Sequence, residues 1–387
     1  MFIDRLKQNN PELIQASLQL FRAGKILPDT YVLDYDAIME NGRQMKKVAD
    51  DYGVKLFYML KQIGRNPLIA KGLDELGFDG CVAVDFKEAL LMKKNNCKLA
   101  HVGHLVQIPN HALKAIIEAE PQYFTVYSYE MIERINDVCK KLNKKQKIVL
   151  RIVDEDSDLY AGQVGGFASS DLKELVSKIN NLENIVIGGL TVFPALLYDA
   201  NEVKIVPTKN MKAMDRAKQI MYELGYNDLM INMPSCTCSN AIPIIKEAGG
   251  NCGEPGHGLT GTTPLHKDRE QVEKVGYLYL SEVSHNFKDS GYCYGGGHYR
   301  RSHVEKALVG DELKEIKVIN PNLESIDYHF ELAGKQKIGE PVIMCFRTQV
   351  FTTRSHVAVV KGIGGGNPEL IGLYNSLGEP IENNWSK

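Results

Sequence analysis

Lys61 stands directly behind an apolar run, residues 55–60 (KLFYML), which is typical of a buried β-strand. A lysine at the rim of such a strand is partly desolvated, and desolvation lowers the pKa of an amine. The neutral amine is then available to form an imine with a carbonyl compound. A structural alternative stays open, because lysines at strand ends often extend their ammonium group into solvent.

A glycine-rich turn late in the chain is the second feature that could carry chemistry. Residues 254–261 read EPGHGLTG, and Gly256, Gly258 and Gly261 match the dinucleotide-binding pattern G-x-G-x-x-G. That pattern requires a following helix and an early β-α-β position, whereas residues 262–264 (TTP) come next. We therefore reject a nicotinamide cofactor. The backbone N–H groups of such a turn can instead hold one phosphate, although a plain linker has the same composition.

A hydroxyl-rich segment, residues 234–239 (PSCTCS), follows another strand-like run, and its Ser235 could add a phosphate donor. The spacing of Cys236 and Cys238 suggests zinc. Structural zinc needs four ligands, however, and distant residues would supply the other two only through a coincidence of folding. We predict no metal site here.

The segment 291–301 (GYCYGGGHYRR) places aromatic and basic side chains around three glycines. Tyr294 precedes the glycines, and Arg300 follows them. Functional loops often have this composition, but so do surface hairpins, so both interpretations stay open.

The elements that must position these residues form a regular pattern. Between residues 54 and 254, short β-rich runs alternate with amphipathic helical segments such as 131–142 and 211–224. This alternation predicts an α/β fold, and eight units over roughly 200 residues is the size of a TIM barrel. A doubly wound open sheet has the same local pattern and is the alternative. The expected strands are 55–60, 80–84, 99–102, 123–126, 148–153, 185–192, 229–233 and 251–254.

The two ends of the chain have other patterns. The first residues are helical in pattern, and one helix is expected to begin at Asn10-Pro11-Glu12. After residue 266 the runs are β-rich and helical periodicity disappears. We therefore predict an N-terminal helical segment (residues 1–28), a TIM barrel (29–265) and a smaller, mostly β C-terminal domain (266–387).

Composition excludes several classes of partner. The 387 residues carry a formal net charge of −2, so no global field favours nucleic acid or an anionic membrane. The N-terminus does not resemble a secretory signal, and no run approaches the ~18 apolar residues that a membrane helix needs. The eight cysteines lie mostly in apolar runs, which is typical of reduced thiols. The sequence predicts a soluble cytoplasmic protein.

The order of these motifs resembles the fold-type III pyridoxal-phosphate family, which includes alanine racemase, D-amino-acid lyases and basic amino-acid decarboxylases. Residues 31–41 are similar to the family's opening strand and helix, and residues 77–89 to its second β/α unit. Residues 254–256 (EPG) match the decarboxylase form of the eighth-strand motif, where alanine racemase has arginine. The pattern is closest to a YhfX-type branch of this family.

The resemblance implies pyridoxal 5'-phosphate as the cofactor. Lys61 falls where the family places its Schiff-base lysine, and Glu254 falls where the family binds the pyridine nitrogen. The remaining cofactor-binding residues would hold the phosphate. The full expected set is Lys61, Arg65, Ser235, Glu254, Gly256 and His257.

The leading functional hypothesis is amino-acid racemisation. Residues 294–300 resemble the racemase loop that carries the second catalytic base, although Cys293 and Gly296 replace two of its residues. The resemblance implies that Lys61 removes the α-proton of the cofactor-bound amino acid on one face, while Tyr294, contributed by the other subunit, acts on the opposite face. A homodimer with shared active sites follows from this arrangement.

Two alternatives stay open. Glu254 suits a lyase or a decarboxylase equally well, although the chain lacks the Cys-Asp dipeptide of the decarboxylases. The arginine that racemases present after the fifth strand is absent from residues 162–167, so alanine is not assumed as the substrate. A protein that binds pyridoxal phosphate without turnover is the second alternative; such relatives are single barrels, and the β domain with Tyr294 argues against it.

Overall fold

Eight parallel strands form a closed barrel in the computed structural model, which describes residues 1–322, 324 and 326–385. Each strand coincides with one of the eight runs expected from the sequence, so the TIM barrel is confirmed over the open sheet. The runs are apolar because barrel strands are buried on both faces. They close in the order β10-β11-β2-β3-β4-β5-β6-β7. The strands are β2 (Lys55–Met59), β3 (Gly80–Val82), β4 (Leu99–Val102), β5 (Tyr123–Val126), β6 (Gln146–Arg151), β7 (Ile185–Thr191), β10 (Met230–Asn232) and β11 (Cys252–Gly253).

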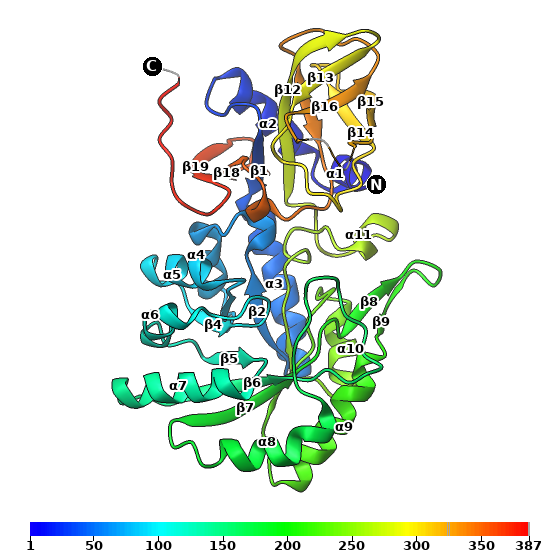
Figure 1. The fold of residues 1–387 in the computed structure, drawn as a ribbon. Helices are drawn as coiled ribbons and strands as arrows, with labels where there is room; N and C mark the ends of the chain where they lie inside the picture. Colours follow the sequence, from blue (N-terminus) through cyan, green and yellow to red (C-terminus); the bar gives the residue numbers. More distant parts are fainter. Residues whose placement is uncertain (323, 325, 386–387) are drawn as a thin grey trace. The chain divides into compact units, whose positions relative to one another are not determined.

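Helices lie around the outside of these strands (Figure 1). One of them, Tyr129–Leu142, begins after Ser128, whose hydroxyl caps it, and ends at Asn143 in the left-handed conformation. Its buried residues Ile132, Ile135 and Cys139 recur at helical spacing and face the barrel. The hairpin β8 (Leu196–Asp199) and β9 (Lys204–Pro207) is inserted after β7. The helices are α3 (Tyr35–Tyr52), α4 (Pro67–Glu75), α5 (Phe86–Lys94), α6 (Leu113–Glu118), α7 (Tyr129–Leu142), α8 (Leu172–Ile179), α9 (Asn210–Glu223) and α10 (Ala241–Glu247).

A nine-stranded sheet forms the core of the rest of the chain, as expected of a mostly β domain. The strand order is β13-β16-β15-β14-β17-β12-β1-β18-β19. The N-terminal segment is helical, as predicted, and its Leu6 and Leu13 share one cluster of buried side chains with Leu278 of the sheet. The elements are α1 (Phe2–Asn9), α2 (Pro11–Arg22), β1 (Thr30–Asp34), α11 (Pro264–Asp268), β12 (Tyr277–Phe287), β13 (Ser290–Tyr294), β14 (Lys306–Val309), β15 (Lys314–Ile319), β16 (His329–Ala333), β17 (Pro341–Met344), β18 (His356–Lys361) and β19 (Glu369–Asn375).

Strand β1, which the resemblance placed at the opening of the barrel region, lies in this sheet. It pairs antiparallel with β12 and parallel with β18, and all five of its residues are buried. It is therefore a central strand of the sheet, and in sequence it precedes all the barrel strands.

The compact units are consequently interleaved along the chain. A short segment that begins at Lys61 belongs to the unit built on the sheet, although the chain on both sides of it belongs to the barrel. Among the residues that the structure describes, no helix is long and apolar enough to span a membrane. The barrel unit comprises residues 43–60 and 70–256, and the sheet unit comprises residues 1–42, 61–69 and 257–387.

Barrel closure between β7 and β10 depends on a glycine. A Cβ added at Gly189 would lie 2.5 Å from the backbone oxygen of Met230 in the neighbouring strand. We expect Gly189→Ala to lower the free energy of unfolding by about 1–3 kcal/mol, as overpacked substitutions do. Urea unfolding followed by circular dichroism measures this change. Gly364→Ala is the control, because an added Cβ there meets no atom within 4 Å; equal stability losses in the two variants would contradict the packing argument.

Candidate functional site

A buried carboxylate lies at the end of β11. Glu254 is 6% exposed, and its Oε1 accepts two hydrogen bonds, from His101 Nδ1 at 2.9 Å and from Asn232 Nδ2 at 2.8 Å. Its backbone N–H donates to Thr237 Oγ1, in the loop after β10, at 3.1 Å. The two donors to the carboxylate come from the ends of β4 and β10. Such donors are what a buried carboxylate requires to remain charged.

The second ring nitrogen of His101 also has a partner. The Thr125 hydroxyl lies within hydrogen-bond distance of His101 Nε2, and both side chains are fully buried. In the described part of the chain, this hydroxyl has no other hydrogen-bond partner. His101 is therefore held on both sides, with Nδ1 facing Glu254 and Nε2 facing Thr125.

The second oxygen of Glu254 is left available. Within the described residues no hydrogen bond reaches Oε2, and His104 Nε2 lies 3.7 Å from it. Burial raises the pKa of Glu254, but the charge of His104 and the hydrogen bonds from His101 and Asn232 outweigh burial and lower the pKa to about 2. Glu254 is therefore an anion at neutral pH, and its Oε2 has an ion-pair contact with His104 but accepts no hydrogen bond from the described residues.

A metal ion is the other group that this cluster could hold. Ligand atoms of His101, His104 and Glu254 lie within 4.8 Å of one another, and all three residues are buried. The sequence interpretation did not identify either histidine. The signal for them was the spacing H-x-x-H at the end of the third expected strand, residues 99–102.

Arg151, the last residue of β6, was also missed. It is 1% exposed, donates to Tyr127 Oη at 2.7 Å and to the Gln163 carbonyl at 2.6 Å, and stacks over the Tyr127 ring. No carboxylate among the described residues forms an ion pair with it. Carboxyl ends of barrel strands carry the active sites of this fold, so an arginine ending the run IVLR was the available signal.

The segment that carries Ser235 has an unusual backbone. Ser235 and Cys236 both have positive φ, at 95° and 53°, although neither is a glycine. Non-glycine residues in such conformations persist where the surrounding structure enforces them, and they concentrate at ligand sites. The barrel unit therefore contains three of the expected cofactor residues, Ser235, Glu254 and Gly256.

The glycine-rich turn has free donors, as a phosphate site requires. In the described part of the chain, the backbone N–H groups of Gly256, His257 and Gly258 donate to no protein atom. Further along the same turn, the N–H of Thr262 donates to the His257 carbonyl at 2.8 Å. Three unpaired N–H groups on consecutive residues fit an oxyanion such as phosphate.

Lys61 and this turn leave the barrel from neighbouring strands. The N–H of Met59, at the end of β2, donates to the carbonyl of Pro255 just beyond β11 at 2.8 Å. Lys61 and His257 each follow two residues later. Burial lowers the pKa of the His257 imidazole well below its ordinary value, and the charges of Arg347 and Lys61 lower it further. His257 is thus neutral at pH 7, in a positively charged environment.

Arg65 is fixed by the sheet unit. It is 4% exposed and has a φ of 54°, and its guanidinium lies 5.0 Å from the centre of the Phe351 ring. The preceding Gly64 also needs to be a glycine, because its φ is 64° and an added Cβ would lie 2.9 Å from Val357. The segment that begins with Lys61 is therefore packed firmly against β18 and its preceding loop. Whether Arg65 binds the phosphate stays a prediction.

Tyr294 is the last residue of β13 and is 40% exposed. Its carbonyl accepts hydrogen bonds from Ser281 Oγ at 2.7 Å and Tyr279 Oη at 3.3 Å, which hold the backbone while the side chain stays accessible. The following glycines are required by packing, since a Cβ at Gly297 would lie 2.2 Å from Tyr279. Tyr294 is therefore a fixed, exposed phenol of the sheet unit.

The barrel and the residues at its mouth identify the class of protein. The family model for the alanine racemase N-terminal domain matches residues 33–264, and that for the YhfX-like C-terminal domain matches residues 278–370. The chain belongs to the alanine racemase N-terminal domain family, within the fold-type III pyridoxal-phosphate enzymes.

Individual relatives are similar to this chain along most of its length. YhfX of Escherichia coli (strain K12) is 41% identical over 385 residues, which cover 98% of this chain and 100% of that protein. The structure of D-threonine aldolase from Filomicrobium marinum is similar with a TM-score of 0.69 and 14% identity, covering 92% of this chain and 96% of that one. Diaminopimelate decarboxylase from Helicobacter pylori, complexed with L-lysine, has a TM-score of 0.67 and 13% identity, with coverages of 95% and 97%. At these identities the two structures establish a shared fold and leave the reaction open.

The charge of Glu254 gives a test on the protein alone. We expect His101→Leu to lower the free energy of unfolding at pH 7 by about 3–5 kcal/mol, because it leaves a buried charge without its donor. A lowered pKa stabilises the fold above about pH 4.5, the ordinary pKa of glutamate, and that contribution is lost progressively as the pH falls from there through about 2. His101→Leu raises the pKa of Glu254, because one of the hydrogen bonds that offset burial is gone. Protonation then relieves the buried charge, so the stability deficit of His101→Leu relative to the unmodified protein should shrink as the pH falls below about 4.5. Urea unfolding at several pH values measures both effects.

Two variants serve as controls for this experiment. His101→Asn keeps an N–H donor, so the pKa of Glu254 should stay low and the pH profile should stay close to that of the unmodified protein. His111→Leu makes the same change at an exposed histidine and should leave the profile unaltered. Coincident pH profiles for His101→Leu and the unmodified protein would refute the assigned role of His101.

Proposed function

We propose that this protein is a pyridoxal-phosphate-dependent amino-acid racemase. The observation that carries the proposal is Glu254, a buried anion with one unoccupied oxygen at the end of the last barrel strand. A protonated pyridine nitrogen is a donor that matches this oxygen. Membership of the fold-type III family supports the same assignment.

Each expected cofactor residue then has a role. Lys61 would attach the cofactor through its amine, and Glu254 would bind the cofactor's pyridine ring. The phosphate is held by the N–H groups of Gly256 and His257, by Ser235 and by Arg65. A neutral His257 ring is compatible with this, because its backbone N–H supplies the contact. When bound, pyridoxal phosphate supplies an electron sink for the charge that develops at the α-carbon.

The proton transfers are assigned to two residues on opposite faces of the amino acid. Lys61 would take the α-proton of the amino acid at Nζ on one face. The Tyr294 hydroxyl, contributed by the other subunit of a homodimer, would donate a proton on the opposite face. The exposure of Tyr294 supports this, since a side chain that serves a second subunit has to be accessible on its own. Glu254 would remain ionised during both transfers.

A lyase or decarboxylase is the second candidate. Glu254 favours it to the same extent, because carbon–carbon cleavage also leaves negative charge at the α-carbon. A panel of amino acids separates the two functions. A racemase converts either enantiomer to the same mixture, whereas a lyase or decarboxylase releases ammonia, an aldehyde or carbon dioxide.

Lys61 is tested by cofactor attachment. The protein reconstituted with pyridoxal phosphate should show a visible absorbance band, and after borohydride reduction mass spectrometry should find the cofactor on the peptide that contains Lys61. Lys61→Ala should lose both signals. Lys55→Ala, at the exposed start of the same strand, is the matched control and should retain them. A colourless, unmodified protein after reconstitution would end the proposal.

Tyr294 is tested by the direction of the reaction. We expect Tyr294→Phe to lower kcat/KM by about 10²–10⁴-fold, as loss of a general acid–base group does. Exchange of the α-proton in heavy water should persist for the enantiomer that Lys61 deprotonates and should disappear for the other. Tyr292→Phe, two residues earlier in β13, is the control. Equal effects on both enantiomers would remove Tyr294 from the mechanism.

A further inference from the structure

A cavity of about 460 Å³ lies wholly within the sheet unit. It is lined by the start of α1, by α11, by the segment that leads into β14 and by the loop after β17. Its volume falls within the range of small-molecule sites, roughly 300–1,000 Å³. None of the residues proposed for the cofactor is among the described residues that line it.

The cavity wall carries an excess of positive charge. Glu305 is the one acidic residue among the described residues of the lining. Two of the lining cations have acidic partners: Lys306 lies 3.6 Å from Asp4, and Lys267 lies 3.6 Å from Asp268. The cationic side chains of the lining are Lys267, Arg301, Lys306 and Arg347.

Arg347, in contrast to Lys306 and Lys267, has no acidic partner among the described residues. Among the described residues it forms no ion pair, and its Nε is buried without a hydrogen-bond partner. Its positive charge extends to His257, where it adds to burial in lowering the pKa of the imidazole. A guanidinium binds an oxyanion best, through two parallel hydrogen bonds. Arg347 is therefore a cation that lacks an anion.

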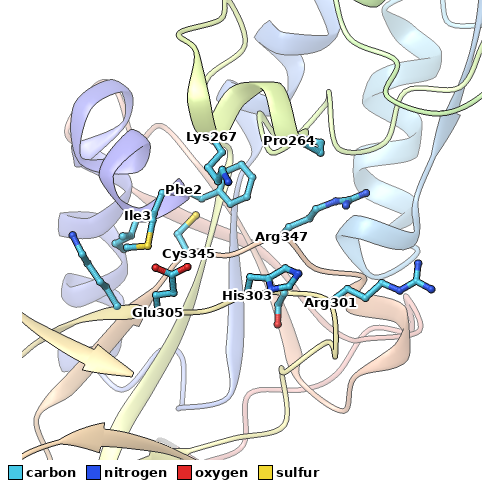
Figure 2. A pocket seen from close by; sticks show the side chains of 12 residues that line it. Phe2, Ile3, Pro264, Lys267, Arg301, His303, Glu305, Cys345 and Arg347 are labelled. Atoms are coloured by element: carbon cyan, nitrogen blue, oxygen red, sulfur yellow. The ribbon is translucent and has the colours of Figure 1, made fainter. Parts of the chain in front are cut away.

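The lining has two different sides. Figure 2 shows Phe2, Ile3 and Cys345 on one side of the pocket, with Lys267 and Glu305 beside them, while Arg301 and Arg347 extend towards the other. His303 lies beside Arg301 in this view. The apolar side chains on one side and the two arginines on the other fit a molecule with a hydrocarbon part and an acidic end.

We propose that this cavity binds a small aliphatic carboxylate, with the carboxylate held by Arg347 and Arg301 and the hydrocarbon chain packed against Phe2 and Ile3. The site is distinct from the proposed cofactor site and does not depend on it. Inorganic phosphate satisfies the arginines but leaves the apolar side unused, so it binds more weakly. Acetate, with the same acidic group and a short chain, binds more weakly for the same reason.

The test is a ligand-observed NMR titration of the full chain, without added cofactor, using sodium hexanoate, sodium acetate and inorganic phosphate. We expect hexanoate to bind at least about tenfold more tightly than acetate, because each buried methylene contributes about 0.8 kcal/mol. Arg347→Gln and Arg301→Gln should each weaken hexanoate binding by about tenfold or more. Arg347→Lys keeps the positive charge but loses the two parallel hydrogen bonds of the guanidinium. Its loss of hexanoate affinity should therefore be smaller than that of Arg347→Gln.

Arg300→Gln is the matched control, because Arg300 is the exposed neighbour of Arg301 and does not line the cavity. It should bind hexanoate as the unmodified protein does. Thermal unfolding without ligand checks that each variant is folded, and Arg301→Gln carries the test if Arg347→Gln does not fold. The proposal is overturned if hexanoate does not bind, if phosphate binds as tightly as hexanoate, or if the variants at positions 347 and 301 match Arg300→Gln.

Discussion

A carboxylate that has been removed from water must find donors inside the protein, and this requirement organises the mouth of the barrel. Glu254 obtains them from His101 and Asn232, which stand at the ends of two different strands. The Thr125 hydroxyl on a further strand lies at the other ring nitrogen of His101 and holds the imidazole in place. Four strand ends therefore cooperate to maintain one negative charge.

Local patterns predicted the eight strands, because each is a short apolar run flanked by helical periodicity, but they left an open sheet as the alternative to the barrel. They also placed Lys61, Glu254 and Ser235 after strand ends, and the roles of these residues stay a prediction. One result was beyond such reasoning: β1 pairs with strands more than two hundred residues away, so nothing near it in sequence reveals its sheet. His101 and Arg151 had sequence signals, but their partners appear only when barrel closure brings the strand ends together.

The interleaving of the units bears on how this protein could have arisen and how it can be divided. A barrel cut out at its C-terminal boundary would keep the codon for Lys61 but lose the β18 residues against which Gly64 packs and the aromatic ring beneath Arg65. Lys61 would then stand on a segment that has lost its packing partners. Loss or exchange of the C-terminal half by recombination thus also changes the support of Lys61, although that residue is encoded within the barrel region.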